Sequence, residues 1–230
     1  MYRILIADDD IELTDLLTEY LQREGFSTES ANDGETALKM AREGNYDMVI
    51  LDIMMPKMNG FDVLRQLRKH SQVPVLMLTA RGDDVDSIVG LEIGADDYLS
   101  KPCNPRVLIA HMRAILRRSD APATTESENI KIANLELIRG SRKVMLNGQA
   151  LNMTSTEFSI LEALMDNAGN VVTKELLSER ALGKKLSPYD RSLDMHISNL
   201  RKKLMTDTDQ NDCIITIRGV GYQFIVASHE

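Results

Sequence analysis

The stretch Asp47-Met-Val-Ile-Leu-Asp52-Ile-Met-Met-Pro56-Lys-Met-Asn-Gly60 contains a short apolar run that ends at an acidic residue. A run of this length, followed by Pro and Gly, is typical of a strand that is buried on both faces and ends in a loop. Asp52 would then lie at the carboxyl end of the strand, where ligands bind in open α/β sheets. Taken alone, such a carboxylate is as readily a helix cap or a turn residue.

Strand-like and helix-like patterns alternate on both sides of this stretch. Such alternation predicts a parallel sheet with helices on both faces, and five βα units fit in the first half of the chain. The expected strands are 3–7, 26–31, 48–51, 73–79 and 97–99, and the expected helices are 12–24, 34–44, 61–69, 84–93 and 105–118.

The whole chain has 230 residues, of which 43% are hydrophobic and 27% charged, as in ordinary water-soluble proteins. No apolar run is long enough to cross a bilayer, and the N-terminus opens on a strand pattern rather than a signal peptide. Cys103 and Cys213 lie far apart without metal-ligand spacing. They are typical of reduced thiols, so a cytoplasmic protein without a membrane partner is expected.

The second half of the chain has a different pattern. Residues 119–129 are polar and lack periodicity, which predicts a linker between domains at 1–118 and 130–230. Residues 130–151 alternate and turn at Asn147-Gly148, so hairpins are expected. Helical patterns follow Thr154 and span 173–181 and 188–204, before a Gly-rich hairpin at 214–226. The last of these helices would have Ser187 as its cap, Pro188 as its first residue and Asp190 three residues after the cap. This order predicts an α+β winged helix-turn-helix.

Acidic side chains follow two strands that are expected to be neighbours. Asp8-Asp9-Asp10 follows the first strand and Asp52 the third, and these two strands adjoin at the switch point of a five-stranded doubly wound sheet. Carboxylates this close repel one another unless a cation lies among them. Hard oxygen ligands favour Mg²⁺. The remaining strands end in Thr79-Ala80 and Lys101-Pro102.

The combination of Asp8-Asp9, Asp52, Thr79-Ala80 and Lys101-Pro102 resembles the receiver domain of two-component response regulators, which is flavodoxin-like. With the winged helix behind it, nearly the whole chain resembles the OmpR/PhoB subfamily of transcription factors. The stretches Leu78-Thr-Ala-Arg-Gly82 and Asp194-Met-His-Ile-Ser-Asn-Leu-Arg-Lys-Lys-Leu204 are most similar to its CpxR-type branch.

The resemblance implies a role for each of these residues. Asp52 would take a phosphoryl group from a sensor histidine kinase, and the receiver would assist only its own phosphorylation and dephosphorylation. Asp9, Asp52 and the backbone carbonyl of Met54 would hold Mg²⁺, with Asp8 acting through water. Lys101, before a cis-type Pro, would pair with a phosphate oxygen.

Thr79 would turn its hydroxyl to the phosphoryl group, and Tyr98 would swing inward as the switch residue. The resemblance also implies a phosphorylation-promoted homodimer and contact with RNA polymerase. Its dimer face would include Asp96, Asp97, Arg113, Arg117 and Arg118 as exposed charges. Ser87, Val107, His111 and Cys103 depart from the usual pattern there, which weakens or rearranges the expected pairing.

A helical wheel of residues 189–204 gives a narrow arc of Leu193, Ile197, Leu200 and Leu204 that faces the core. The other side predicts a face for double-stranded promoter DNA. Asn199 would read adenine and Met195 thymine methyl groups, while His196 is structural or faces phosphate. The remaining expected contacts on this helix are Arg191, Ser198, Arg201, Lys202 and Lys203.

The terminal hairpin carries Arg218, which would enter the adjacent minor groove. Tyr222 fits a core residue and a DNA contact equally well. Residues 121–230 hold 13 Lys/Arg and 14 Asp/Glu, so weak binding by a monomer and tighter binding by a dimer are expected.

Two alternatives compete with this interpretation. An aspartyl phosphatase would carry an acid/base Asp two residues after the nucleophile, where this chain has Met54. A DNA-binding protein with a degenerate receiver would have lost the Asp, Thr and Lys residues that are present here.

Overall fold

The computed structural model describes residues 1–79, 84–119, 129–187, 190–205 and 213–225. The chain divides into two compact units, Met1–Leu116 and Arg117–Glu230. Side chains of residues 84–87 and 119 are not described, and the expected linker lies mostly outside the described residues. No helix in the described ranges has the length and apolar character that a membrane span requires.

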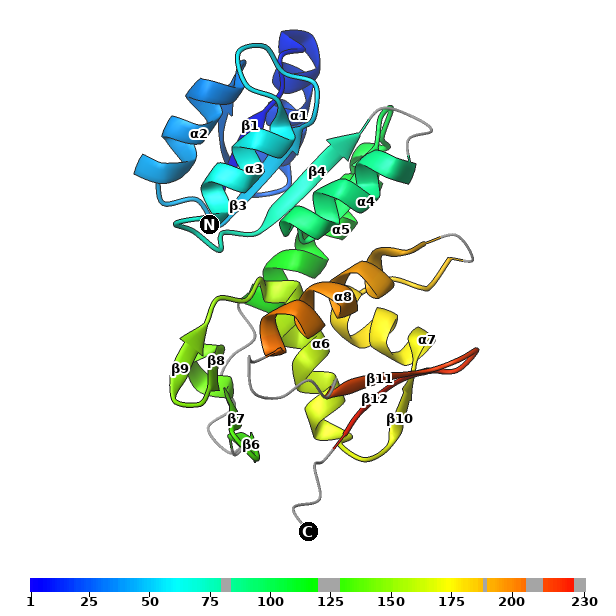
Figure 1. Ribbon diagram of the computed structural model, residues 1–230. Helices are drawn as coiled ribbons and strands as arrows, with labels where there is room; N and C mark the ends of the chain where they lie inside the picture. The colour runs from blue at the N-terminus through cyan, green and yellow to red at the C-terminus, as the bar shows by residue number, and fades with distance from the viewer. Residues whose placement is uncertain (80–83, 120–128, 188–189, 206–212, 226–230) are drawn as a thin grey trace. The chain divides into compact units, whose positions relative to one another are not determined.

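The first unit contains the five alternating strands and helices that its sequence predicts, with boundaries within two residues (Figure 1). The strands are β1 (Arg3–Ala7), β2 (Ser27–Ala31), β3 (Met48–Asp52), β4 (Val75–Thr79) and β5 (Asp97–Ser100). The helices are α1 (Ile11–Arg23), α2 (Gly34–Glu43), α3 (Gly60–Arg68), α4 (Asp84–Ile93) and α5 (Pro105–Ser119).

All five strands form one parallel sheet in the order β2-β1-β3-β4-β5, which confirms that β1 and β3 adjoin. Both faces of the sheet centre are buried because alternate residues of β1, β3 and β4 contribute to two separate cores. Leu5 and Val49 pack with α2 and α3 on one face. Ile4 and Ile50 pack with α1 and α5 on the other. The apolar run of β3 is therefore explained by burial on both sides.

Side-chain caps begin three helices of this unit. Asp10 accepts the Leu13 amide and Asp33 accepts the Thr36 amide, each from the position before the helix. Asn59 does the same for α3. An oxygen in this place binds an amide that has no partner within the helix, which stabilises each helix by about 1 kcal/mol. The short acidic and amide residues after the strands therefore also define where the helices start.

The described residues of the second unit form two antiparallel sheets, a short 3-10 helix at Arg139–Ser141 and the helices α6 to α8. One sheet is β6 (Ile130–Ile132), β7 (Leu135–Ile138), β8 (Lys143–Leu146) and β9 (Gln149–Leu151), with the expected turn at Asn147-Gly148. The other has β12 (Gly221–Phe224) between β11 (Ile214–Ile217) and β10 (Val171–Thr173), as Figure 1 shows. The strand β10 was not predicted, because three residues are too few to show a period.

The helices of the second unit differ in part from the prediction. The first, α6 (Ser155–Asp166), begins with a capping box between Thr154 and Glu157, as predicted. The second was expected over 173–181, but α7 (Lys174–Leu177) passes into a π-helix at Ser178–Leu182.

The third helix of this unit, α8 (Ser192–Leu204), begins four residues later than predicted. Asp190 Oδ1 accepts both the amide and the hydroxyl of Ser192, at 2.8 and 2.6 Å. A side chain that binds the amide two residues ahead stabilises a turn rather than a helix, so the helix starts after it. The expected first residues of the helix, Pro188 and Tyr189, lie outside the described part of the chain.

Candidate functional site

A cluster of three carboxylates lies at the carboxyl edge of the parallel sheet. Asp8 and Asp9 follow β1, Asp52 ends β3, and the pairing of Ala7 with Leu51 brings the two strand ends together. One carboxylate oxygen from each of the three residues lies within 4.8 Å of the others. Asp8 and Asp52 are buried and Asp9 is exposed. The clustering expected from the topology is confirmed.

Lys101 extends from the end of β5 into this cluster. Its ammonium Nζ lies 2.6 Å from Asp8 Oδ2 and 2.7 Å from Asp52 Oδ1. The Lys101–Pro102 peptide bond is cis, as the resemblance implies. Asp52 Oδ2 accepts the Met54 amide at 2.9 Å. Both carboxylate oxygens of Asp52 are therefore oriented, one by a cation and one by the main chain.

The cluster has more negative than positive charge. Burial raises the pKa of the Asp52 carboxyl, and the Asp8 carboxylate adds to this, while Lys101 and the Met54 amide oppose both. Burial acts to lower the pKa of Lys101, but its bonds to Asp52 and Asp8 prevail and raise it. Three carboxylates and one ammonium leave two negative charges, which a divalent cation with hard oxygen ligands would offset. The donor set therefore fits Mg²⁺.

Thr79 and Tyr98 belong to the neighbouring strands β4 and β5. Thr79 ends β4, pairs with Ser100 of β5, and is buried. Tyr98 is half-buried and packs against the core that includes α2 and α3. Ala80, the expected partner of Thr79 in the motif, lies outside the described residues.

The loop after Asp52 is held by contacts that the sequence analysis missed. The Gly60 amide donates to the Ile53 carbonyl at 2.9 Å, and a Cβ on Gly60 would lie 2.1 Å from the Asp52 carbonyl oxygen. Asp33 pairs with Lys57 at 2.8 Å across the same loop. The Asn59-Gly60 pair signalled a turn, but a close backbone approach depends on tertiary packing.

Five charged residues of the expected dimer face were predicted to be exposed, and this is wrong for three of them, which are buried. Asp96 is fully buried and accepts from Arg68 at 3.3 Å and from the Val75 amide at 3.0 Å. Asp97 lies 2.7 Å from His111 Nδ1 and is 3% exposed. Buried carboxylates need such partners, which sequence charge alone does not reveal.

The third buried residue of the expected dimer face is Arg118, which donates to Thr156 Oγ1 at 2.6 Å and to the Ala181 carbonyl at 3.0 Å. Arg113 and Arg117 are exposed, as expected. Val107 is also exposed, and Cys103 is half-buried. The side chain of Ser87 lies outside the described residues.

The exposed arc of α8 carries most of the residues expected to contact nucleic acid. Arg191 and Lys202 are exposed, and Met195, Ser198 and Arg201 are partly exposed. Asn199 is the exception, because its side chain is only 6% exposed. The wheel assumed a narrow buried arc of four apolar residues, whereas Ser192, His196 and Asn199 form a second buried row beside it. The placement of Asn199 on the outer face was wrong.

Several cations of this helix make contacts within the second unit. Arg201 donates to the Ile214 carbonyl and to Thr216 Oγ1, both at 2.8 Å, and so joins α8 to β11. Lys203 Nζ lies 2.6 Å from Glu157 Oε2. These bonds favour a structural role over a free phosphate contact for both residues. His196 is 1% exposed and therefore also structural.

The tip of the terminal hairpin presents Arg218. Arg218 is exposed in the turn between β11 and β12, where the Val220 amide donates to the Ile217 carbonyl at 3.0 Å. Gly219 has a φ of 74°, which favours glycine there. Tyr222 is 3% exposed and its hydroxyl donates to Asp194, so the structure places it in the core. Desolvation and Asp194 raise the pKa of its hydroxyl.

Comparisons with known proteins match both units. Residues 4–113 match the family of response regulator receiver domains, and residues 148–224 match the family described as transcriptional regulatory protein, C terminal. The chain is 49% identical to the transcriptional regulatory protein CpxR of Klebsiella pneumoniae, over 99% of this chain and 100% of that protein. It is 42% identical to the DNA-binding response regulator MtrA of Mycolicibacterium paratuberculosis, over 96% and 97%.

A solved structure agrees with these matches. The response regulator DrrB of Thermotoga maritima, described as an OmpR/PhoB homolog, is 33% identical with a TM-score of 0.52. The likeness covers 98% of this chain and 99% of that one. With a receiver domain, a transcription-regulatory DNA-binding domain and relatives that match from end to end, the chain belongs to the two-component response regulators of the OmpR/PhoB type.

Proposed function

We propose that Asp52 is the phosphoacceptor, and that a sensor histidine kinase is the donor of its phosphoryl group. The observation that carries this is the Lys101 ammonium, 2.7 Å from Asp52 Oδ1 at an edge with three clustered carboxylates. A carboxylate nucleophile forms an acyl phosphate, which is labile and suits a reversible signal.

Asp9, Asp52 and the Met54 carbonyl would hold Mg²⁺, with Asp8 acting through water. The clustered oxygens and the excess negative charge support this assignment. A bound Mg²⁺ supplies electrostatic stabilisation of the charge that develops on the transferring phosphoryl oxygens. Lys101 would then exchange its bond to Asp52 for one to a phosphoryl oxygen.

The signal would be reported by two residues beside the site. The Thr79 hydroxyl would turn toward the phosphoryl group, and Tyr98 would fill the space that it leaves. Thr79 ends β4 and Tyr98 lies in the paired strand β5, which supports this role. A local charge that selects between two packings is a common switching device.

The receiver would act only on itself and not as an enzyme on other substrates. A phosphatase with an aspartyl nucleophile needs an acid/base group near the leaving oxygen, and Met54 cannot move a proton. The Met54 side chain is also 71% exposed, so it does not enclose a substrate pocket.

The output would be control of transcription through a phosphorylation-promoted homodimer on promoter DNA, in contact with RNA polymerase in the cytoplasm. A receiver at 1–118, a linker at 119–129 and a DNA-binding domain at 130–230 would carry these steps. The exposed arc of α8 and Arg218 support the DNA contact. Arg191, Ser198 and Lys202 would bind phosphates or base edges, with Met195 at thymine methyl groups.

A phosphodonor and Mg²⁺, added to the full chain and followed by intact mass, test the phosphoacceptor. Wild-type protein should gain one phosphoryl group and Asp52→Asn should gain none. The exposed carboxylate variant Asp15→Asn is the matched control and should label like the wild type. Equal labelling of Asp52→Asn would remove Asp52 from this role, whereas rapid turnover of the donor would favour a phosphatase.

A salt titration of DNA binding tests the output face. Arg218→Ala should weaken binding to all sequences and lower the salt slope by about 1, because one cation that would enter the minor groove is lost. Lys131→Ala, an exposed cation of β6, is the control and should change neither. A slope that falls equally in both variants would contradict the assignment of Arg218 to the interface.

A further inference from the structure

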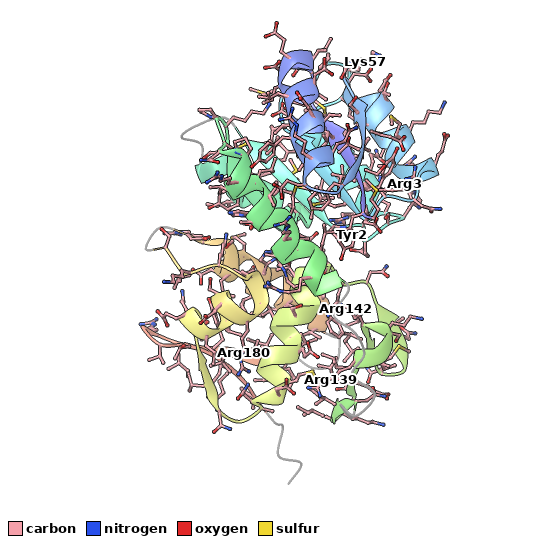
Figure 2. The ribbon with its side chains drawn as sticks, turned by 180° about the vertical axis from the view of Figure 1, so that it is seen from behind. Tyr2, Arg3, Lys57, Arg139, Arg142 and Arg180 are labelled. Carbon is pink, nitrogen blue, oxygen red and sulfur yellow. The ribbon has the colours of Figure 1, made fainter. Side chains whose placement is uncertain are left out.

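The second unit contains a cavity of about 330 Å³ that its expected functions do not use. Four guanidinium groups line it: Arg117 and Arg118 from the end of α5, Arg142 from the turn before β8, and Arg180 from the π-helix. Figure 2 labels Arg142 and Arg180 beside α6, with Arg139 nearby. All of these residues belong to the unit Arg117–Glu230.

The two acidic residues at the cavity wall form ion pairs with an arginine that does not line the cavity. Glu162 Oε1 lies 3.0 Å from Arg139 Nε, and Asp166 also pairs with Arg139. Arg139 lies outside the cavity lining. Much of the negative charge of Glu162 and Asp166 is thus offset from outside, and the cavity is left with an excess of positive charge.

Arg142 is held in place by neutral groups. It donates to the Ser155 carbonyl at 3.1 Å and to Ser159 Oγ at 3.0 Å, and its guanidinium lies 4.2 Å from the Phe158 ring centre. Burial lowers the pKa of Arg142, with Arg118 adding to the effect and Glu162 opposing it. These contacts fix the orientation of a half-buried cation without supplying a counter-charge.

Arg117 and Arg180 form the exposed part of the wall. Within the described ranges neither makes a salt bridge with an acidic residue. Four cations around one cavity repel each other, which costs folding free energy unless an anion lies between them. Guanidinium groups that are already held in position lose little side-chain entropy when a ligand binds, which favours tight binding of such an anion.

We propose that this cavity binds the diphosphate group of a small phosphorylated molecule. Guanidinium groups bind phosphate oxygens in pairs, with a geometry that ammonium groups do not offer. The volume is more than twenty times the roughly 10–15 Å³ that one water molecule needs on the same measure, so a single phosphate leaves most of it unfilled. The Ser159 hydroxyl at the wall accepts from Arg142 at 3.0 Å and donates to the Ser155 carbonyl at 3.1 Å, so it helps to hold Arg142 in place.

A small molecule fits this cavity better than the backbone of duplex DNA. Arg118 is buried and Arg142 is half-buried, so a ligand must enter the cavity to reach them. Phosphates of a duplex lie on a convex surface and would meet only Arg117 and Arg180. The site is also separate from Asp52, and binding should be the same in wild-type protein and in Asp52→Asn.

Calorimetric titration of the full chain with pyrophosphate, at fixed ionic strength, tests the proposal. Wild-type protein should bind one pyrophosphate per chain, and more tightly than it binds inorganic phosphate. The double variant Arg117→Gln/Arg180→Gln should bind about tenfold more weakly or worse, as expected for lost charge-assisted bonds. Both arginines are exposed, so the fold should persist, and circular dichroism checks this.

The matched control is Lys131→Gln/Lys143→Gln, which removes two exposed cations of the same unit away from the cavity. Its pyrophosphate affinity should equal that of the wild type. Absence of saturable binding, or an equal loss in both double variants, would overturn the proposal. So would displacement of pyrophosphate by a random-sequence duplex together with weaker duplex binding in Arg117→Gln/Arg180→Gln, because the arginines would then be a nucleic-acid contact.

Discussion

Gly60→Ala should disturb the Asp52 site although residue 60 takes no part in its chemistry. The added Cβ would lie 2.1 Å from the Asp52 carbonyl oxygen and 3.0 Å from Ile53 Cα. An ordinary contact starts near 3.4 Å, so the two backbones must separate by about 1.3 Å (3.4 − 2.1). Overpacking of this kind costs about 1–3 kcal/mol of folding free energy.

The same displacement should slow phosphorylation, because Asp52 and the Met54 loop would move together. A misplacement of about 1 Å can reduce a reaction rate by roughly 100-fold. Stability is measured by urea unfolding followed by circular dichroism, and the rate by mass spectrometry with a small phosphodonor. The change in rate should exceed any change in the fraction of folded protein.

Gly90→Ala is the matched control within the same unit. Its Cβ would lie 3.4 Å from Met77 Cγ, an ordinary contact, and residue 90 is inside α4. Ala is the better helix former, so this variant should be more stable by about 0.5–1 kcal/mol. If Gly60→Ala matched Gly90→Ala in stability and labelling rate, the close approach would not hold the site.

Three further changes have calculable outcomes. Arg68→Met should destabilise the first unit by about 3–5 kcal/mol in urea unfolding, because the fully buried side chain of Asp96 loses its ion-pair partner; a loss below about 1 kcal/mol would contradict this. Thr154→Ala should cost about 1 kcal/mol through loss of the α6 cap, seen as a lower thermal midpoint for the second unit, and Thr154→Ser should restore it. Burial acts to raise the pKa of Asp190, but the neighbouring Lys184 prevails and lowers this pKa below 3.8. The ionised Asp190 side chain therefore contributes fully to folding stability above about pH 5, and this contribution is lost as the pH falls through 3.8 and below. The stability difference between wild type and Asp190→Asn should therefore shrink between pH 5 and 3, and a constant difference would contradict this.

The first unit was predictable because its local and global signals agree. The strands β1, β3 and β4 are short apolar runs, helical patterns separate them, and the alternation leaves few topologies. Asp8, Asp52 and Lys101 could be placed together for the same reason, since they follow strands whose ends share one edge. Strand ends are positions that topology alone determines.

Burial of charged side chains could not be read in the same way. Asp96 was expected to be exposed, but its partner Arg68 is 28 residues away, and no local pattern links the two. Asn199 is buried beside the apolar residues of α8, although the helical wheel predicted a narrower buried arc that left Asn199 outside it. Both errors concern long-range packing, which decides which face of an element is covered.

The boundaries in the second unit were less accurate because its elements are short. Three or four residues, as in β10 or α7, show neither a strand period nor a helix period. Stronger local signals, such as Asn147-Gly148 and the capping box at Thr154, were placed correctly. Turn and cap chemistry therefore predicted more here than hydrophobic periodicity did.

The origin of the proposed phosphoacceptor site in three separate strands has a consequence during protein synthesis. Asp8 follows β1, Asp52 ends β3 and Lys101 follows β5, the last strand of the sheet. Contacts between residues this far apart in sequence form late in folding, after the loops between them have closed. A nascent chain therefore cannot receive a signal before its whole receiver is made and folded, and unfinished chains do not compete with complete ones for the kinase.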